Sequence, residues 1–130
     1  MMPGKNTEVG PPEMNDVGES DNHADDKRRQ LIDLFLRRTQ AEVEQMRRGV
    51  PRLISGDAAA WHELRFHAQR INGQAAGLEL GVLSACAREL ARLADEKFAG
   101  AELDANFLLS TTSAIEMVAI ELNELFSQFP

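Results

Sequence analysis

The sequence predicts an all-α fold: an antiparallel up-down four-helix bundle with a short additional helix at its N-terminal end. The composition lacks Tyr, has only 5% aromatic residues and is rich in Ala, Leu, Glu and Arg, which favours helix. From about Asp26 onward, apolar residues recur at spacings of three and four, and no segment alternates with the period of two typical of a strand. The length of 130 residues is sufficient for one domain with a real core.

The first 25 residues differ in composition from the rest of the chain. They carry one Lys and six Asp or Glu, a net charge of −5, whereas the remaining 13 basic and 15 acidic residues give −2. This segment has almost no large apolar residues, so it cannot bury enough surface to offset the entropy lost on ordering. We therefore expect a disordered acidic tail over residues 1–25 and a helical bundle over residues 26–130. The acidic balance disfavours nucleic-acid binding.

The first part of the bundle contains signals for helix ends as well as for helices. The segment LIDLFLRR, residues 31–38, predicts a short first helix. Thr39 and Glu42 have the spacing of a capping box, which indicates a new helix start or a kink. Pro51 falls inside the next apolar run and should bend or loosen that helix, because proline lacks a backbone donor.

The next helix has the most regular pattern in the chain. Asp57 follows Ser55-Gly56 and is a suitable N-cap for it. Apolar residues then recur at spacings of 3, 4, 3, 4 and 3, which predicts a buried stripe. The members of this stripe are Trp61, Leu64, Ala68, Ile71, Ala75 and Leu78.

Two further amphipathic helices follow. Gly77 and Gly81 bracket a turn, and the helix after it should bury Leu83, Ala87, Leu90 and Ala94. Residues 97–104 form a connection, and the last helix should begin at about Asp104. Its predicted inward residues are Leu108, Ile115, Val118, Leu122, Leu125 and Phe129.

Two features indicate where the protein works. Cys86 is the single cysteine, so no intrachain disulfide can form and a reducing compartment is favoured. No apolar run reaches the length of a membrane span and the N-terminus is polar, so we expect neither a transmembrane helix nor a signal peptide. We therefore expect a cytoplasmic protein without membrane association, in which Cys86 is a buried inert thiol.

The segment AQRINGQAAGL, residues 68–78, resembles the signature of histidine-containing phosphotransfer (HPt) domains, roughly A-H-x-L-K-G-S-A-x-x-L. Without a gap, Ala68, Ile71, Gly73, Ala75 and Leu78 take its small and apolar positions. The resemblance covers about residues 28–95 and is weak over the last helix. It implies a helical bundle that binds a response-regulator receiver domain or a histidine kinase in two-component signalling.

The departures from the signature fall on its chemical positions. Gln69 stands where the family has the phospho-histidine, Asn72 where it has lysine, and Gln74 where it has a small serine-like residue. A glutamine amide has no basic lone pair that could accept a phosphoryl group. The resemblance therefore implies a non-catalytic protein that acts by occupying its partner, with neither enzymatic activity nor a cofactor.

We expect the binding surface to surround Gln69. His62, Gln69 and Ala76 are seven residues apart and share one helix face. In the family, the glycine one turn after the histidine lets a receiver domain come close, and Gly73 has that position. The predicted binding residues are His62, Arg65, Gln69, Asn72, Gly73 and Ala76.

Two alternatives stay open. An active phosphotransfer protein could use His62 or His67, although Phe66 would crowd a receiver at His62 and His67 lies beside the buried stripe. These histidines are five residues apart, which is the wrong spacing for a shared helical zinc site, so no metal is expected. The other alternative is a helical scaffold or oligomerisation module without signalling chemistry.

Overall fold

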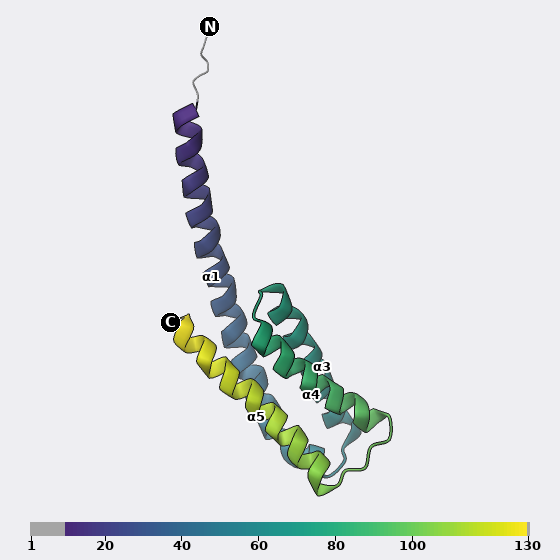
Figure 1. Ribbon diagram of the computed structural model, residues 1–130. Coiled ribbons are helices and arrows are strands. Elements are labelled where there is room, and N and C mark those ends of the chain that lie inside the picture. Colours follow the sequence, from purple (N-terminus) through teal and green to yellow (C-terminus); the bar gives the residue numbers. More distant parts are fainter. Residues whose placement is uncertain (1–9, 130) are drawn as a thin grey trace. The chain divides into compact units, whose positions relative to one another are not determined.

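The computed structural model describes residues 10–129, with side chains from residue 23 onward, and every regular element in this range is a helix (Figure 1). The prediction of an all-α fold is confirmed. The helices are α1 (Gly10–Arg48), α2 (Val50–Ile54), α3 (Ala58–Gly77), α4 (Gly81–Phe98) and α5 (Ala105–Gln128).

The chain divides into two units, of which the first ends at Leu34 and the second begins at Phe35. In its described part the first unit consists of the first turns of α1. Helix therefore covers residues 10–25, where the composition predicts disorder, while residues 1–9 lie outside the described residues. The prediction of disorder rests only on how little apolar surface this segment can bury. It leaves out helix propagation, in which each residue added to an existing helix forms one more backbone hydrogen bond. A domain boundary at residue 25 stays a prediction.

The short additional helix lies at a different place from the predicted one. Helix α1 continues through Thr39, whose hydroxyl donates to the Phe35 carbonyl at 2.7 Å, and Glu42 is buried rather than capping. The predicted separate helix over residues 31–38 and the capping box are therefore wrong. The short helix is α2, which follows a break at Gly49 and has Pro51 in its first turn. Proline is tolerated there because the first backbone donors of a helix have no intrahelical acceptor.

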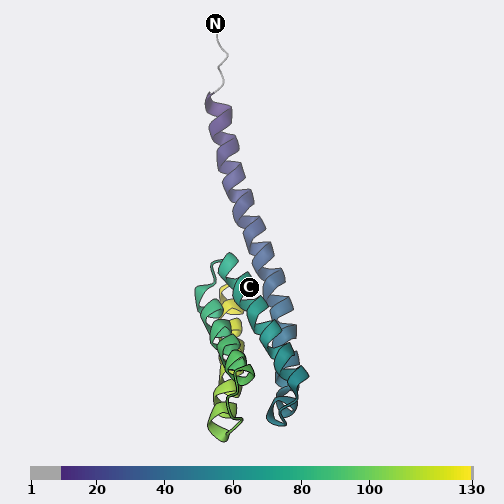
Figure 2. The same cartoon turned by 90° about the vertical axis from the view of Figure 1, so that its right-hand side faces the viewer.

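Helices α2 to α5 and the last turns of α1 build the second unit. Within it α3 packs against both α2 and α4, and α4 packs against α5 (Figures 1 and 2). The predicted stripe of α3 is buried from Trp61 to Ala75. Leu78 is the exception, because α3 ends at Gly77 and the chain turns there, so that Leu80 is buried instead. The predicted residues of α4 are also buried: Leu83, Ala87, Leu90 and Ala94.

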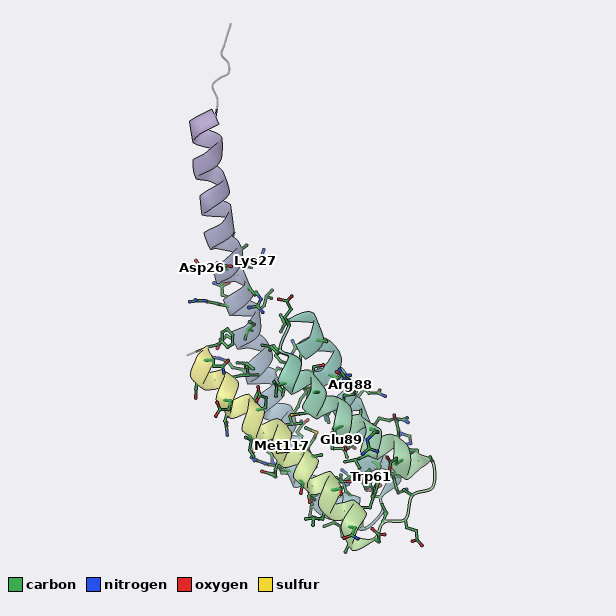
Figure 3. All side chains as sticks on the ribbon, in the orientation of Figure 1. Asp26, Lys27, Trp61, Arg88, Glu89 and Met117 are labelled. Atoms are coloured by element: carbon green, nitrogen blue, oxygen red, sulfur yellow. The ribbon has the colours of Figure 1, made fainter. Side chains whose placement is uncertain are left out.

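Trp61 lies near the start of α3, toward the end of the bundle where the helix connections are (Figure 3). Its side chain is fully buried, and its indole nitrogen donates to the Leu53 carbonyl at 3.1 Å. Its ring centroid lies 5.9 Å from that of Phe107. One side chain of α3 therefore contacts both α2 and α5.

Local signals set the ends of the last helices. Asp57 accepts from the Ala59 amide at 3.0 Å, and Asp104 accepts from the Phe107 amide at 2.8 Å. The connection between α4 and α5 contains Gly100 at φ 106°, a left-handed conformation that favours glycine. Four of the six predicted inward residues of α5 are buried, while Leu108 and Phe129 near its ends are half-buried.

Candidate functional site

The exposed face of α3 carries most of the predicted binding residues. Ala68 is fully buried and the next residue, Gln69, is exposed. This is the orientation that the comparison with the HPt signature requires. His62, Gly73 and Ala76 are exposed as well, because they lie on the side of the helix opposite the apolar stripe.

Gly73 has open space around it. A Cβ atom built on this residue would meet no heavy atom within 4 Å outside its own helix backbone. Glycine in the middle of a helix costs roughly 0.5–1 kcal/mol relative to alanine, and packing does not require it here. The result is a stretch of helix surface on which the backbone is accessible.

Asn72 differs from the expectation because it is turned toward the neighbouring helix. The Ser84 hydroxyl on α4 donates to Asn72 Oδ1 at 2.6 Å, and Asn72 is half-buried. The side chain therefore fastens α3 to α4 at the edge of the exposed face. The helical pattern places residue 72 beside the face, but only the position of Ser84 decides which way the amide points.

The other edge of the face includes a residue that sequence reasoning missed. The Phe98 ring, at the end of α4, stacks against His62 with ring centroids 4.3 Å apart. The Arg65 guanidinium carbon lies 4.6 Å from the same ring centroid, and Arg65 also approaches Asp95 at 3.5 Å. Phe98 therefore contacts both His62 and Arg65. The sequence of α3 does not predict this contact, because Phe98 belongs to α4.

A second polar cluster lies behind the face, between α1 and α3. Glu42 is 4% exposed, and its Oε2 atom accepts from His67 Nδ1 at 2.8 Å and from the Arg70 guanidinium. Glu42 Oε1 and Arg70 Nε are buried and have no hydrogen-bond partner among the residues whose side chains the structure describes. The sequence assigns Glu42 to a cap and His67 to the core boundary, so their pairing across 25 residues was missed.

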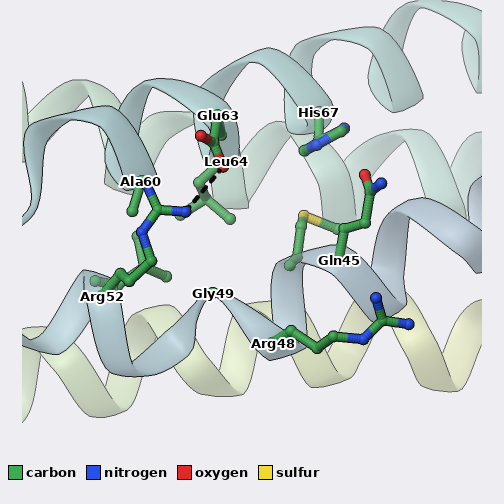
Figure 4. A pocket seen from close by; sticks show the side chains of 10 residues that line it. Gln45, Arg48, Gly49, Arg52, Ala60, Glu63, Leu64 and His67 are labelled. Carbon is green, nitrogen blue, oxygen red and sulfur yellow. Dashed lines mark hydrogen bonds and ion pairs between the residues drawn. The ribbon is translucent and has the colours of Figure 1, made fainter.

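His67 also lines a cleft of about 400 Å³ where α1 ends and α2 and α3 begin (Figure 4). Its apolar wall includes Met46, Leu53 and Leu64. In Figure 4 the Arg52–Glu63 ion pair closes one end of the cleft, and His67 lies at the other. This volume is within the usual range for small-molecule sites.

Cys86 offers no nucleophile. The thiol is half-buried, and burial raises its pKa, with a smaller contribution from the charge of Glu121. A raised pKa keeps the thiol protonated near neutral pH, which makes it unreactive. Among the described residues, no three His, Cys, Asp or Glu side chains are arranged to hold a metal ion.

No protein-family model matches the chain, and no curated protein or solved structure is significantly similar to it. Over residues 10–129, none of the helices combines the length and the apolar content needed to cross a membrane.

Proposed function

We propose that the protein is a non-catalytic, HPt-like component of two-component signalling in the cytoplasm. It would bind a response-regulator receiver domain or a histidine kinase through α3 and modulate that partner by occupying its phosphotransfer surface. The proposal includes the finer topology: the last turns of α1 together with α3, α4 and α5 would form an antiparallel up-down bundle.

The observation that best supports this function is the exposed Gln69 beside the open surface at Gly73. Three apolar positions of the signature, Ala68, Ile71 and Ala75, are buried, and the fourth, Leu78, is half-buried. The altered positions carry polar residues outside the buried stripe. The surface at Gly73 leaves room for a receiver domain to approach the helix, but position 69 has no histidine to accept a phosphoryl group. Such a surface can bind a receiver domain without taking its phosphoryl group.

The isolated protein should therefore accept no phosphoryl group from a phosphorylated receiver domain or from a histidine kinase. Phosphoryl transfer needs a nucleophilic atom, and the Gln69 amide offers none. Radiolabelled phosphate bound in acid-labile form is the measurement. Label on the wild type that disappears in His62→Ala or in His67→Ala would contradict the prediction and assign the acceptor.

One observation favours a second candidate, an active phosphotransfer protein that uses His67. A hydrogen bond from Nδ1 to a buried carboxylate orients the imidazole and leaves Nε2 for chemistry. Against it, only 16% of the His67 side chain is exposed, which limits the approach of a receiver domain. The phosphorylation assay distinguishes this candidate from the leading one.

The binding function itself is tested by capture from the source cell with immobilised full-length protein. The matched control is Gln69→Arg, which changes the centre of the exposed face of α3 without touching the core. We expect the wild type to retain proteins with receiver or histidine-kinase domains and the variant to lose them. Equal capture by both proteins, or capture of neither domain class, would favour the plain scaffold.

A further inference from the structure

Helix α1 carries a stripe of exposed residues besides the residues that it buries. Leu31 and Leu34 are each more than half exposed, and the exposed residues Lys27 and Arg38 lie one turn before and one turn after them. The four residues recur at spacings of four, three and four, which places them on one face of the helix. We call these four residues the basic stripe.

Helix α5 carries a similar stripe on the side opposite its buried residues. Leu109, Met117 and Ile120 are each more than half exposed, and Ser113 and Glu124 on the same face are exposed as well. Every charged residue of α5 is a glutamate. We call these five residues the acidic stripe, and Figure 3 labels one member of each stripe, Lys27 and Met117.

The charges of the two stripes are opposite in sign. Residues 27–38 contain five basic residues and one acidic residue, whereas α5 has no basic residue. Lys27 and Arg38 form no ion pair with any residue whose side chain the structure describes, and the same is true of Glu124. Each stripe therefore combines exposed apolar side chains with charges that could bind a partner of opposite charge.

Charge also decides which surface can cover each stripe. Pairing of the basic stripe with the same stripe of another molecule would bring Lys27 and Arg38 close to like charges. Pairing of two acidic stripes would do the same with glutamates. Like charges brought together at an interface disfavour association, so each stripe suits the other stripe rather than a copy of itself.

The spacing of the residues in the two stripes is also compatible. The two leucines of α1 are three residues apart, as are Met117 and Ile120, so the two pairs can pack against each other. Glu124 follows Ile120 by one turn. It lies opposite Lys27 if the two helices are antiparallel and opposite Arg38 if they are parallel. A basic residue therefore faces Glu124 in either orientation.

We propose that the protein self-associates, with the basic stripe of one copy packed along the acidic stripe of a second copy. The contact would remove the exposed leucines, Met117 and Ile120 from water, which favours association. The charges at its edges would select this pairing. The contact involves α1 and α5, whereas the proposed binding of a signalling partner involves α3.

The test is sedimentation equilibrium of the full-length protein. We expect the weight-average mass to rise above that of a monomer at concentrations on the order of 100 μM, as suits a small, transient interface. Leu34→Lys and Ile120→Lys should each weaken self-association at least about tenfold, because each places a charge in the apolar centre of the contact. Circular dichroism checks that the variants fold.

Ile54→Lys is the matched control for Ile120→Lys. Ile54 is 53% exposed, against 56% for Ile120, and it belongs to α2, outside both stripes. The same substitution at a similarly exposed isoleucine should leave self-association at the wild-type level. A wild-type protein that stays monomeric over this concentration range, or equal association of the two variants, would overturn the inference.

Exchange of the charges tests the pairing of the stripes directly. Glu124→Lys should weaken self-association about threefold or more, because it replaces an ion pair by a repulsion. The combined variant Lys27→Glu, Arg38→Glu, Glu124→Lys reverses the charges on both sides and should recover most of the lost affinity. A combined variant that associates no better than Glu124→Lys would contradict the pairing.

Gln69→Arg separates this inference from the proposed function. The substitution changes the exposed face of α3, so it should abolish partner capture and leave self-association unchanged. Ile120→Lys should have the opposite effect, because it changes α5 and leaves the α3 face as it is. The failure of one proposal is therefore measured independently of the other.

Discussion

Gly73→Arg should reduce binding of the proposed partner, a receiver domain or a histidine kinase, at least about tenfold while leaving the fold intact. Open space surrounds a Cβ at this position, so the new side chain extends into solvent without displacing any atom of the bundle. A partner that approaches the α3 backbone would then meet a long, charged side chain. Loss of about 1.4 kcal/mol of interaction already corresponds to tenfold in affinity.

The stability measurement makes this result interpretable. Replacing glycine in a helix by a better helix former should raise the free energy of unfolding by up to about 1 kcal/mol. Partner binding would be measured by titration and unfolding by urea denaturation followed by circular dichroism. Ser113→Arg, an exposed position on α5, is the matched control and should bind normally. Unchanged binding in Gly73→Arg would show that this face is not the interface.

Trp61→Ala should lower the free energy of unfolding by about 3–5 kcal/mol, the usual cost of removing a fully buried large aromatic side chain. The loss also removes the hydrogen bond to Leu53 and the contact with Phe107, so α2 and α5 lose a common partner. This change is a large fraction of the stability of a typical domain.

Urea denaturation followed by circular dichroism is the measurement, because the variant has no tryptophan to report by fluorescence. Trp61→Phe keeps the six-membered ring but loses the indole donor and the five-membered ring, so it should cost less than Trp61→Ala, about 1–3 kcal/mol. A loss below about 1 kcal/mol in Trp61→Ala would mean that burial of Trp61 contributes little to the stability of the fold.

The success of the sequence-based expectations depends on how local the signal is. The stripe from Trp61 to Ala75, the cap at Asp57 and the start of the last helix at about Asp104 were all confirmed. The interruption expected from Pro51 is also present, although the break itself lies at Gly49. Each rests on residues within a few turns of one another, where helix periodicity and backbone hydrogen bonding determine the outcome.

Two expectations failed, and they failed for different reasons. The pair Thr39 and Glu42 has the spacing of a cap, yet Thr39 bonds within α1 and Glu42 faces His67 on another helix. Leu78 continues the periodic stripe, but the end of α3 removes it from that register and Leu80 is buried instead. For Glu42 a contact with a distant helix decides the outcome, whereas the end of α3 is closed locally, with the Leu80 amide donating to the Ala75 carbonyl at 2.8 Å.

By itself the sequence determined that the chain is helical, which face of α3 is buried, and that Gln69 lies outside the core. Those properties follow from periodicity along one helix. Only the tertiary structure decided that Asn72 turns to Ser84, that Phe98 holds His62 and Arg65, and that Glu42 pairs with His67 beside a cleft. These contacts join residues on different helices, and their geometry depends on how the helices pack rather than on the spacing within any one of them.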